Sequence, residues 1–244
     1  MCASNAARRA WRLGSALVLV CAGCGTATEE TSEGTAPPDV VLYDGCRTDD
    51  PALDRADVVA EADLDGDGAM NEVAHVPAGA DGACAGALFT TFNGDPSALA
   101  TPGLGSVAVV ALPGGDRELL LVRGSGHSRG GYGQTLVGGG GRQLGQVLAD
   151  GRPLVGFVAT DGGAAPSTVR CTADGGLASV TASLHEPPGV VLAWDVRTTT
   201  YRLEGNRAVR VASTLDEAVT DPHLQSTLPQ LFDARGTLAD CRRP

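Results

Sequence analysis

Short, mainly apolar runs separated by Gly, Asp and Pro recur along the chain from about residue 40 onward. Runs of this length, bounded by turn-forming residues, are typical of β-strands rather than helices. Between the last two runs, Glu204-Gly205-Asn206-Arg207 predicts a hairpin turn, because Gly and Asn tolerate the positive φ values of tight turns. The pattern predicts strands at 40–43, 107–112, 118–122, 154–159, 168–171, 178–184, 198–203 and 208–212.

Only the segment 216–232 carries a helical pattern. Its leucines at 224, 228 and 231 have helical spacing, Asp221-Pro222 suits a helix start, and Pro229 should end or kink the helix. Four consecutive glycines at 138–141 predict a loop. The expected fold class is therefore mainly β, with antiparallel sheets arranged like a propeller fragment or a sandwich and one short C-terminal helix.

The first 23 residues follow a different pattern. Three arginines precede an apolar run at 13–23, which ends in Ala22-Gly23 before Cys24. This order predicts a secretory signal peptide over 1–23, because the run is too short to span a bilayer. Residues 24–39 are rich in Thr, Glu, Ser, Gly and Pro and predict a flexible tether, so a single β-rich extracytoplasmic domain is expected over 40–244.

The Ala22-Gly23-Cys24 ending resembles the lipobox of bacterial lipoproteins, although Cys21 stands where that family usually has Leu. The resemblance implies that Cys24 becomes the first residue and carries a lipid. It also implies that the lipid bilayer is a partner and that the protein lies on the outer face of the cell membrane. Ordinary secretion with Cys24 as a plain thiol is the alternative, and the choice between Sec and Tat export stays open.

Processing changes the cysteine count from seven to four that are free to pair. Cys2 and Cys21 leave with the leader, and Cys24 takes the lipid. Four cysteines in an exported domain predict two disulfides with three alternative pairings. Pairing of sequence neighbours is favoured, which gives Cys46–Cys84 and Cys171–Cys241. A zinc site is the weaker alternative, because no C-x-x-C spacing remains.

The charge balance excludes one class of partner. The chain has 18 basic and 29 acidic side chains, a net charge of −11, and removal of the leader's arginines makes it more negative still. Nucleic-acid binding needs clustered basic residues, so nucleic acid is not expected as a partner.

The most specific local signal is an acidic loop, since residues 62–76 read ADLDGDGAMNEVAHV. Ca²⁺ takes about six to eight oxygen ligands, and carboxylates at alternate positions of a tight loop converge on one point. Gly66 and Gly68 supply the backbone freedom that such a loop needs. The pattern predicts a structural Ca²⁺ site with ligands from Asp63, Asp65, Asp67, the backbone carbonyl of Ala69 and the side chain of Asn71.

The residues after the loop distinguish two families of calcium loop. An EF-hand has Glu at position 12 and then a helix, whereas this chain has Ala74 within an alternating, strand-like segment, 72–76. The loop instead resembles the FG-GAP or VCBS calcium loop of integrin-type repeats, D-x-D-x-D-G-x-x-[DN] before a strand, which implies the same ligands. A degenerate second copy at 161–169 and an acidic turn without an ion both stay open.

The combination of lipobox, tether and acidic loop also resembles actinobacterial lipoproteins of uncharacterised function. The further segments that carry this resemblance are His185-Glu186-Pro187, Trp194-Asp195 and Tyr201. It implies the location and the calcium site only.

Gly126-His127-Ser128-Arg129-Gly130 matches the G-x-S-x-G elbow of serine hydrolases, with Asp195 and His223 following in the order of that family. The motif requires a helix directly after the serine, and the glycine-rich segment 130–141 is unsuited to one. We therefore expect a non-enzymatic binding or surface-display protein, with a cell-surface protein or a glycan as candidate partner. A secreted serine hydrolase using Ser128 is one alternative. A solute-binding or sensor lipoprotein is another, and a polar cleft would favour it.

Overall fold

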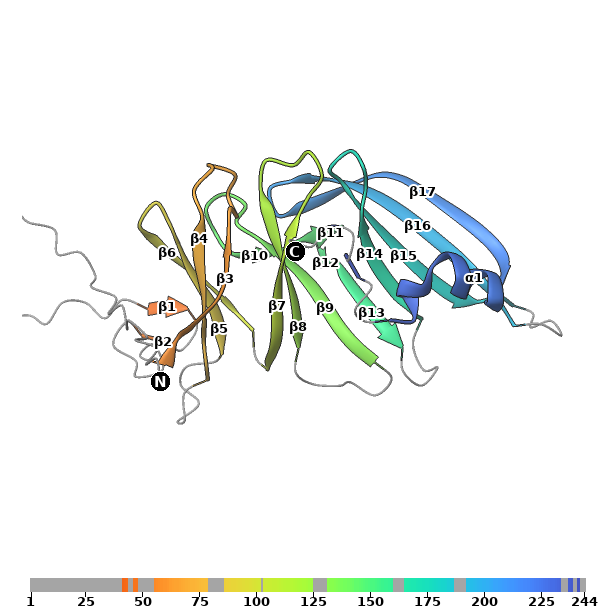
Figure 1. Cartoon of the computed structure of the whole chain (residues 1–244), viewed down its shortest axis with the longest axis horizontal. Helices are drawn as coiled ribbons and strands as arrows, with labels where there is room; N and C mark the ends of the chain where they lie inside the picture. The colour runs from red at the N-terminus through yellow and green to blue at the C-terminus, as the bar shows by residue number, and fades with distance from the viewer. Residues whose placement is uncertain are drawn as a thin grey trace, which may run out of the picture. The chain divides into compact units, whose positions relative to one another are not determined.

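The computed structural model describes residues 41–43, 46–47, 55–78, 86–101, 103–124, 131–159, 165–186, 192–233, 237–238 and 241. These residues form mainly antiparallel β-sheets with one short helix near the C-terminus, which confirms the predicted fold class (Figure 1). Within these ranges, no helix has both the length and the apolar character that crossing a membrane requires.

Two small sheets come first along the chain. The two-stranded sheet pairs β1 (Val41–Tyr43) with β2 (Cys46–Arg47). The four-stranded sheet is a meander in which each strand pairs antiparallel with the next. Its strands are β3 (Asp57–Ala62), β4 (Asn71–Val76), β5 (Ala87–Phe92) and β6 (Asp95–Ala100).

An eleven-stranded sheet contains the rest of the β-structure, in the order β12-β11-β17-β16-β15-β14-β13-β9-β8-β7, with β10 beside β9. Its first strands are β7 (Leu104–Ala111), β8 (Glu118–Gly124), β9 (Gly131–Gly138), β10 (Gly145–Gln146), β11 (Leu148–Ala149) and β12 (Arg152–Pro153). The later strands are β13 (Val155–Ala159), β14 (Ser167–Cys171), β15 (Leu177–Leu184), β16 (Ala193–Glu204) and β17 (Arg207–Thr220).

The large sheet curls into a half-barrel, and one short stretch of chain joins its two sides. Gly145 of β10 pairs with Gly138 of β9, and Leu148 of β11 pairs in parallel with Arg207 of β17. Residues 145–149 therefore connect strands that are far apart in the strand order (Figure 1).

Strand β8 explains how the two larger sheets share a core. Its run Leu119–Val122 is buried throughout. Leu119 and Leu121 belong to a cluster inside the curl, whereas Leu120 and Val122 pack with Leu64 and Phe92 of the four-stranded part. Because successive side chains of a strand point to opposite faces, a continuous apolar run is expected where both faces are covered.

The C-terminal helix is shorter than predicted. Residues 216–220 continue β17 and pair with β16, and α1 spans Asp221–Thr227, followed by the 3₁₀ turn η2 (Pro229–Leu231). Leu224 and Leu231 are fully buried against Val180 and Val196. The Trp194 indole donates to the Asp221 carboxylate at 2.8 Å, which fixes the start of the helix against β16.

Among the strands of five or more residues, β3, β5, β6 and β9 lie where the sequence pattern predicts none. Strand β9 contains the glycine-rich residues 131–138, and it pairs with both β8 and β13. A strand with several glycines lacks the β-branched side chains that mark strands in sequence.

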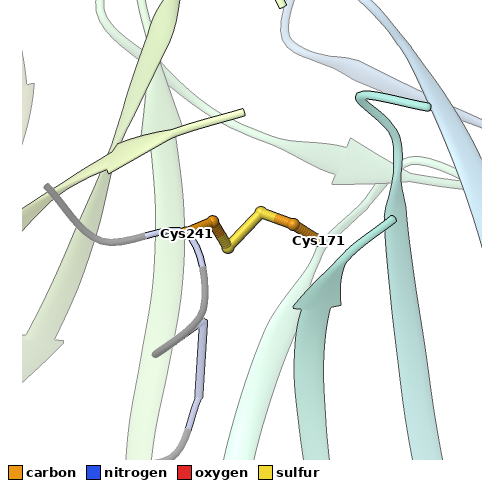
Figure 2. Close-up of a disulfide and its surroundings, with 2 residues drawn as sticks. All are labelled: Cys171 and Cys241. Carbon is orange, nitrogen blue, oxygen red and sulfur yellow. A yellow bond between two sulfur atoms is a disulfide. The ribbon is translucent and has the colours of Figure 1, made fainter. Parts of the chain in front are cut away.

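The sulfur atoms of Cys171 and Cys241 lie at disulfide distance, 2.12 Å, with their Cα atoms 6.2 Å apart (Figure 2). This pair is one of the two that the sequence favours, and it connects the end of β14 to the C-terminal segment. The Cys46–Cys84 pair lies outside the described residues because Cys84 does, as do the leader, Cys24 and the tether.

Candidate metal centre and the cavity beside it

The acidic loop connects β3 to β4, and it brings three carboxylates together. Ligand atoms of Asp63, Asp65 and Asp67 lie within 4.8 Å of one another. Gly66 and Gly68 have φ values of 78° and 84°, which side chains other than glycine rarely adopt, and these residues let the loop fold round the cluster. The arrangement could hold a metal ion.

Hydrogen bonds hold both the carboxylate and the backbone of Asp63. Its two carboxylate oxygens accept the backbone N–H groups of Gly66 at 2.9 Å and Gly68 at 3.0 Å. Its backbone carbonyl accepts the N–H of Glu118 at 2.7 Å, and its own N–H donates to the Glu118 carboxylate at 3.0 Å. The first residue of β8 therefore holds the start of the acidic loop.

Asp65 is the residue whose surroundings call for a further partner. Its Oδ1 atom is buried and accepts no hydrogen bond from the described part of the chain. A buried, unpaired carboxylate oxygen is costly, and such groups in native structures are normally paired with a donor or a cation. Asp67 is exposed, and its Oδ1 accepts the Ala69 N–H at 2.8 Å.

Asn71, which the loop spacing suggests as a further ligand, forms hydrogen bonds within the described part of the chain. Its Oδ1 accepts the Leu64 N–H at 3.0 Å, and its Nδ2 donates to the Thr91 carbonyl at 3.2 Å. The amide thus ties the two ends of the loop to each other and to β5. The carboxylate cluster contains the three aspartates.

The acidic loop also contacts the glycine loop, residues 138–144. The Leu64 carbonyl accepts the Gly139 N–H at 3.2 Å. An added Cβ at Gly139 would lie 2.7 Å from the Phe92 ring and 2.9 Å from the Leu64 carbonyl carbon. Only a residue without a side chain fits at this position.

Asn206, at the tip of the β16–β17 hairpin, inserts into the same glycine loop. Its Oδ1 accepts the Gly140 N–H at 2.9 Å, and its Nδ2 donates to the carbonyls of Gly138 at 3.1 Å and Gln143 at 3.4 Å. The Arg117 guanidinium, from the turn between β7 and β8, donates to the Gly205 carbonyl. Four turns are therefore linked by hydrogen bonds around the aspartate cluster.

A cavity of about 520 Å³ lies beside the cluster and shares Asp65 with it. The other walls come from the turns at 112–117 and 172–176 and from residues 200–211 of the C-terminal hairpin. These turns lie along the same edge of the sheets, at the top in Figure 1. Nothing in the sequence patterns indicates that these segments meet, because they are separated by up to about a hundred residues of chain.

Charged groups of both signs line this cavity, among them Asp116, Asp174, Arg117 and Arg202. A hydrogen bond from the Thr172 side chain, together with backbone amides, lowers the pKa of Asp174, so this carboxylate is ionised at neutral pH. Burial lowers the pKa of Arg117, and the nearby Asp116 charge opposes that effect.

In the described part of the chain, the hydrogen bonds of Asp195 and of His223 involve other residues than the hydrolase alternative requires. Ser128 lies outside it. Asp195 contacts His185 Nδ1 at 2.7 Å and accepts the Ala218 N–H at 3.1 Å, and these interactions, the Ala218 one first, lower the pKa of Asp195. His223 lies on the exposed side of α1, and its backbone carbonyl accepts hydrogen bonds from the hydroxyl groups of Ser226 and Thr227.

No family model matches this chain, and no curated protein or solved structure matches it either. The class that the fold and the site define is a mainly β protein of antiparallel sheets, with an aspartate cluster that could hold a metal ion.

Proposed function

We propose that the protein is an exported, lipid-anchored domain that binds Ca²⁺ through Asp63, Asp65 and Asp67. The buried, unpaired oxygen of Asp65 within this cluster carries the proposal. Three carboxylates within 4.8 Å repel one another unless a cation lies between them. The alternating spacing of the aspartates, with glycines between them, is the sequence pattern of a calcium loop.

Calcium fits the cluster better than the other common ions. The cluster offers oxygen atoms alone, which suits hard cations, whereas zinc sites usually include Cys or His. Mg²⁺ requires nearly ideal octahedral geometry, while Ca²⁺ accepts the irregular geometry that one loop provides. The affinity should resemble that of extracellular modules, with Kd on the order of 10⁻⁴–10⁻³ M.

The role of the ion would be structural. Leu64 and Asp63 bond the acidic loop to the glycine loop and to β8, so an ion that orders the loop also stabilises the contact between the two larger sheets. A ligand that binds only the folded state stabilises it in proportion to the logarithm of its concentration, by about 2.7 kcal/mol at a hundred times Kd.

Calorimetric titration and thermal melts of the purified protein test the metal site. We expect heat of Ca²⁺ binding and a Tm that rises with Ca²⁺ concentration, both absent in Asp65→Asn. The matched control is Asp95→Asn, an exposed aspartate of β6, which should keep both responses. A wild-type protein without any Ca²⁺ response contradicts the proposal, as does an Asp65→Asn variant that binds Ca²⁺ normally.

The lipid anchor is tested separately. We expect Cys24→Ser to release the protein from the membrane fraction, whereas Cys46→Ser should leave it attached. Mass spectrometry of the wild-type N-terminus should show a diacylglycerol-modified Cys24, and an unmodified residue there contradicts this part of the proposal.

A further inference from the structure

Counted as one oxygen from each of its three aspartates, the carboxylate cluster supplies fewer ligand atoms than Ca²⁺ takes. Ca²⁺ requires about six to eight oxygens. The Asn71 amide is already used by Leu64 and Thr91, and position 12 of the loop is Ala74, whose methyl group is buried. Second carboxylate oxygens and the Ala69 carbonyl can fill some of the remaining positions, and water or a bound molecule can fill the others.

The place from which such a molecule could reach the ion is the neighbouring cavity. Asp65 belongs both to the carboxylate cluster and to the cavity wall. A volume of about 520 Å³ lies within the range of small-molecule sites, roughly 300–1,000 Å³. An ion bound to Asp65 is therefore bordered by a space large enough for a small ligand.

The cavity lining selects among ligand classes. The carboxylates of Asp116 and Asp174 accept hydrogen bonds, and the guanidinium groups of Arg117 and Arg202 donate them. With both signs of charge present, the lining favours neither a strong anion nor a strong cation. Thr172 and Thr200 add hydroxyl groups, so the hydrogen-bonding capacity suits a neutral molecule with many hydroxyls.

Apolar side chains cover part of the same cavity. Leu112 and Leu203 belong to its lining, as does Val211, whose side chain is 65% exposed. A saccharide combines hydroxyl groups with apolar C–H faces, and its paired hydroxyls can also serve as oxygen ligands for Ca²⁺.

We propose that this cavity binds a neutral saccharide, with sugar hydroxyls completing the coordination of the ion on the acidic loop. This inference rests on the proposed calcium site. Arg202 would donate to the sugar from the cavity rim, because its contact with Glu204 is an exposed ion pair at 2.6 Å that a ligand can replace at little cost. Val211 would lie against an apolar face of the sugar.

The test is a calorimetric titration of the purified protein with D-glucose, D-galactose, D-mannose, N-acetyl-D-glucosamine, lactose and maltose, in saturating Ca²⁺ and again in EGTA. We expect at least one of these sugars to bind in Ca²⁺ and none in EGTA. Val211→Trp should fill the cavity mouth and weaken sugar binding by about tenfold or more, with Ca²⁺ affinity unchanged. Arg202→Ala should weaken it several-fold.

The control variant is Leu215→Trp, which places the same large side chain at an exposed position of β17 outside the cavity wall and should bind sugar normally. If Ca²⁺ binds but none of the six sugars does, this inference is wrong and the calcium proposal stands. If Ca²⁺ does not bind, the calcium proposal fails and this inference fails with it. Sugar binding that persists in EGTA, or that Val211→Trp leaves unchanged, also overturns the inference.

Discussion

The acidic loop (63–71) and the glycine loop (138–144) lie against each other and are both rich in glycine, but Gly68 of the first and Gly140 of the second have different roles. In the acidic loop, Gly68 has a φ of 84° and an added Cβ would meet nothing within 4 Å. In the glycine loop, a Cβ on Gly140 would lie 2.5 Å from the Asn206 nitrogen, although its φ is not positive. Gly68 is required for its backbone conformation, whereas Gly140 is required because a side chain has no room there.

The two loops also differ in the interactions that stabilise them. The acidic loop concentrates three carboxylates, so its stability should depend on an ion. The glycine loop is held by packing against Phe92 and by the hydrogen bonds of Asn206, neither of which carries charge. Substitutions that change volume, hydrogen bonding, charge or backbone strain should therefore affect the two loops unequally.

The largest effect is expected for added volume in the glycine loop. Gly140→Ala forces the hairpin tip away from the loop and should lower the free energy of unfolding by about 2–3 kcal/mol, as overpacking does in tightly packed sites. Gly133→Ala in β9 is the control, because its Cβ would meet no atom within 4 Å. Urea denaturation measures both, and equal stability of the two variants would contradict the packing explanation.

Loss of the inserted side chain should have a somewhat smaller effect. Asn206→Ala leaves the Gly140 N–H and the Gly138 carbonyl without their partner, which costs roughly 1–3 kcal/mol. Gln143→Ala removes an exposed amide from the same loop and should change stability by less than about 0.5 kcal/mol. Denaturation midpoints that fall together for the two variants would show that Asn206 does not hold the loop.

These contacts also show which parts of the fold could be predicted from the sequence alone. The hairpin turn at 204–207 and the strand at 118–122 follow from local residue types, and the structure has both. The second half of β17 could not be predicted, because residues 212–218 are exposed and carry no apolar alternation. The insertion of Asn206 depends on a partner loop more than sixty residues away, for which the sequence holds no local signal.

The candidate metal site, too, could be predicted from the sequence only in part. The spacing of Asp63, Asp65 and Asp67 predicts a cluster, and the structure brings these three together. The same spacing also suggests Asn71 as a ligand, and the hydrogen bonds of its amide to Leu64 and Thr91 could not be predicted from it. Which of several competing partners a side chain takes depends on tertiary packing, and loop spacing does not contain that information.

When Ca²⁺ is removed, substitution of Asp63 and substitution of Asp65 should change the free energy of unfolding differently. In EGTA, Asp63→Ala should lower the free energy of unfolding by about 1–2 kcal/mol, because the amides of Gly66 and Gly68 lose their acceptor. Asp65→Ala should leave it unchanged or raise it, since the variant removes a buried oxygen that has no donor. With Ca²⁺ present, both variants should be less stable than the wild type.

Chemical denaturation with and without EGTA measures this difference. The sign of the Asp65→Ala effect is the informative quantity. If Asp65→Ala destabilises the metal-free protein as much as Asp63→Ala does, Asp65 has a structural partner and the acidic loop is held in the same manner as the glycine loop.

The smallest effect should come from backbone strain at Gly68. Ala at a φ of 84° costs about 1 kcal/mol, whereas Asn, which tolerates positive φ better, should cost less, and space around the residue is open for both. At Gly140 the order must reverse, because Asn is larger than Ala and the nearest atoms belong to Asn206. Denaturation of the four variants in EGTA, so that ion binding does not contribute, gives the two rankings. The same ranking at both positions would mean that one property of glycine, conformation or size, governs both Gly68 and Gly140.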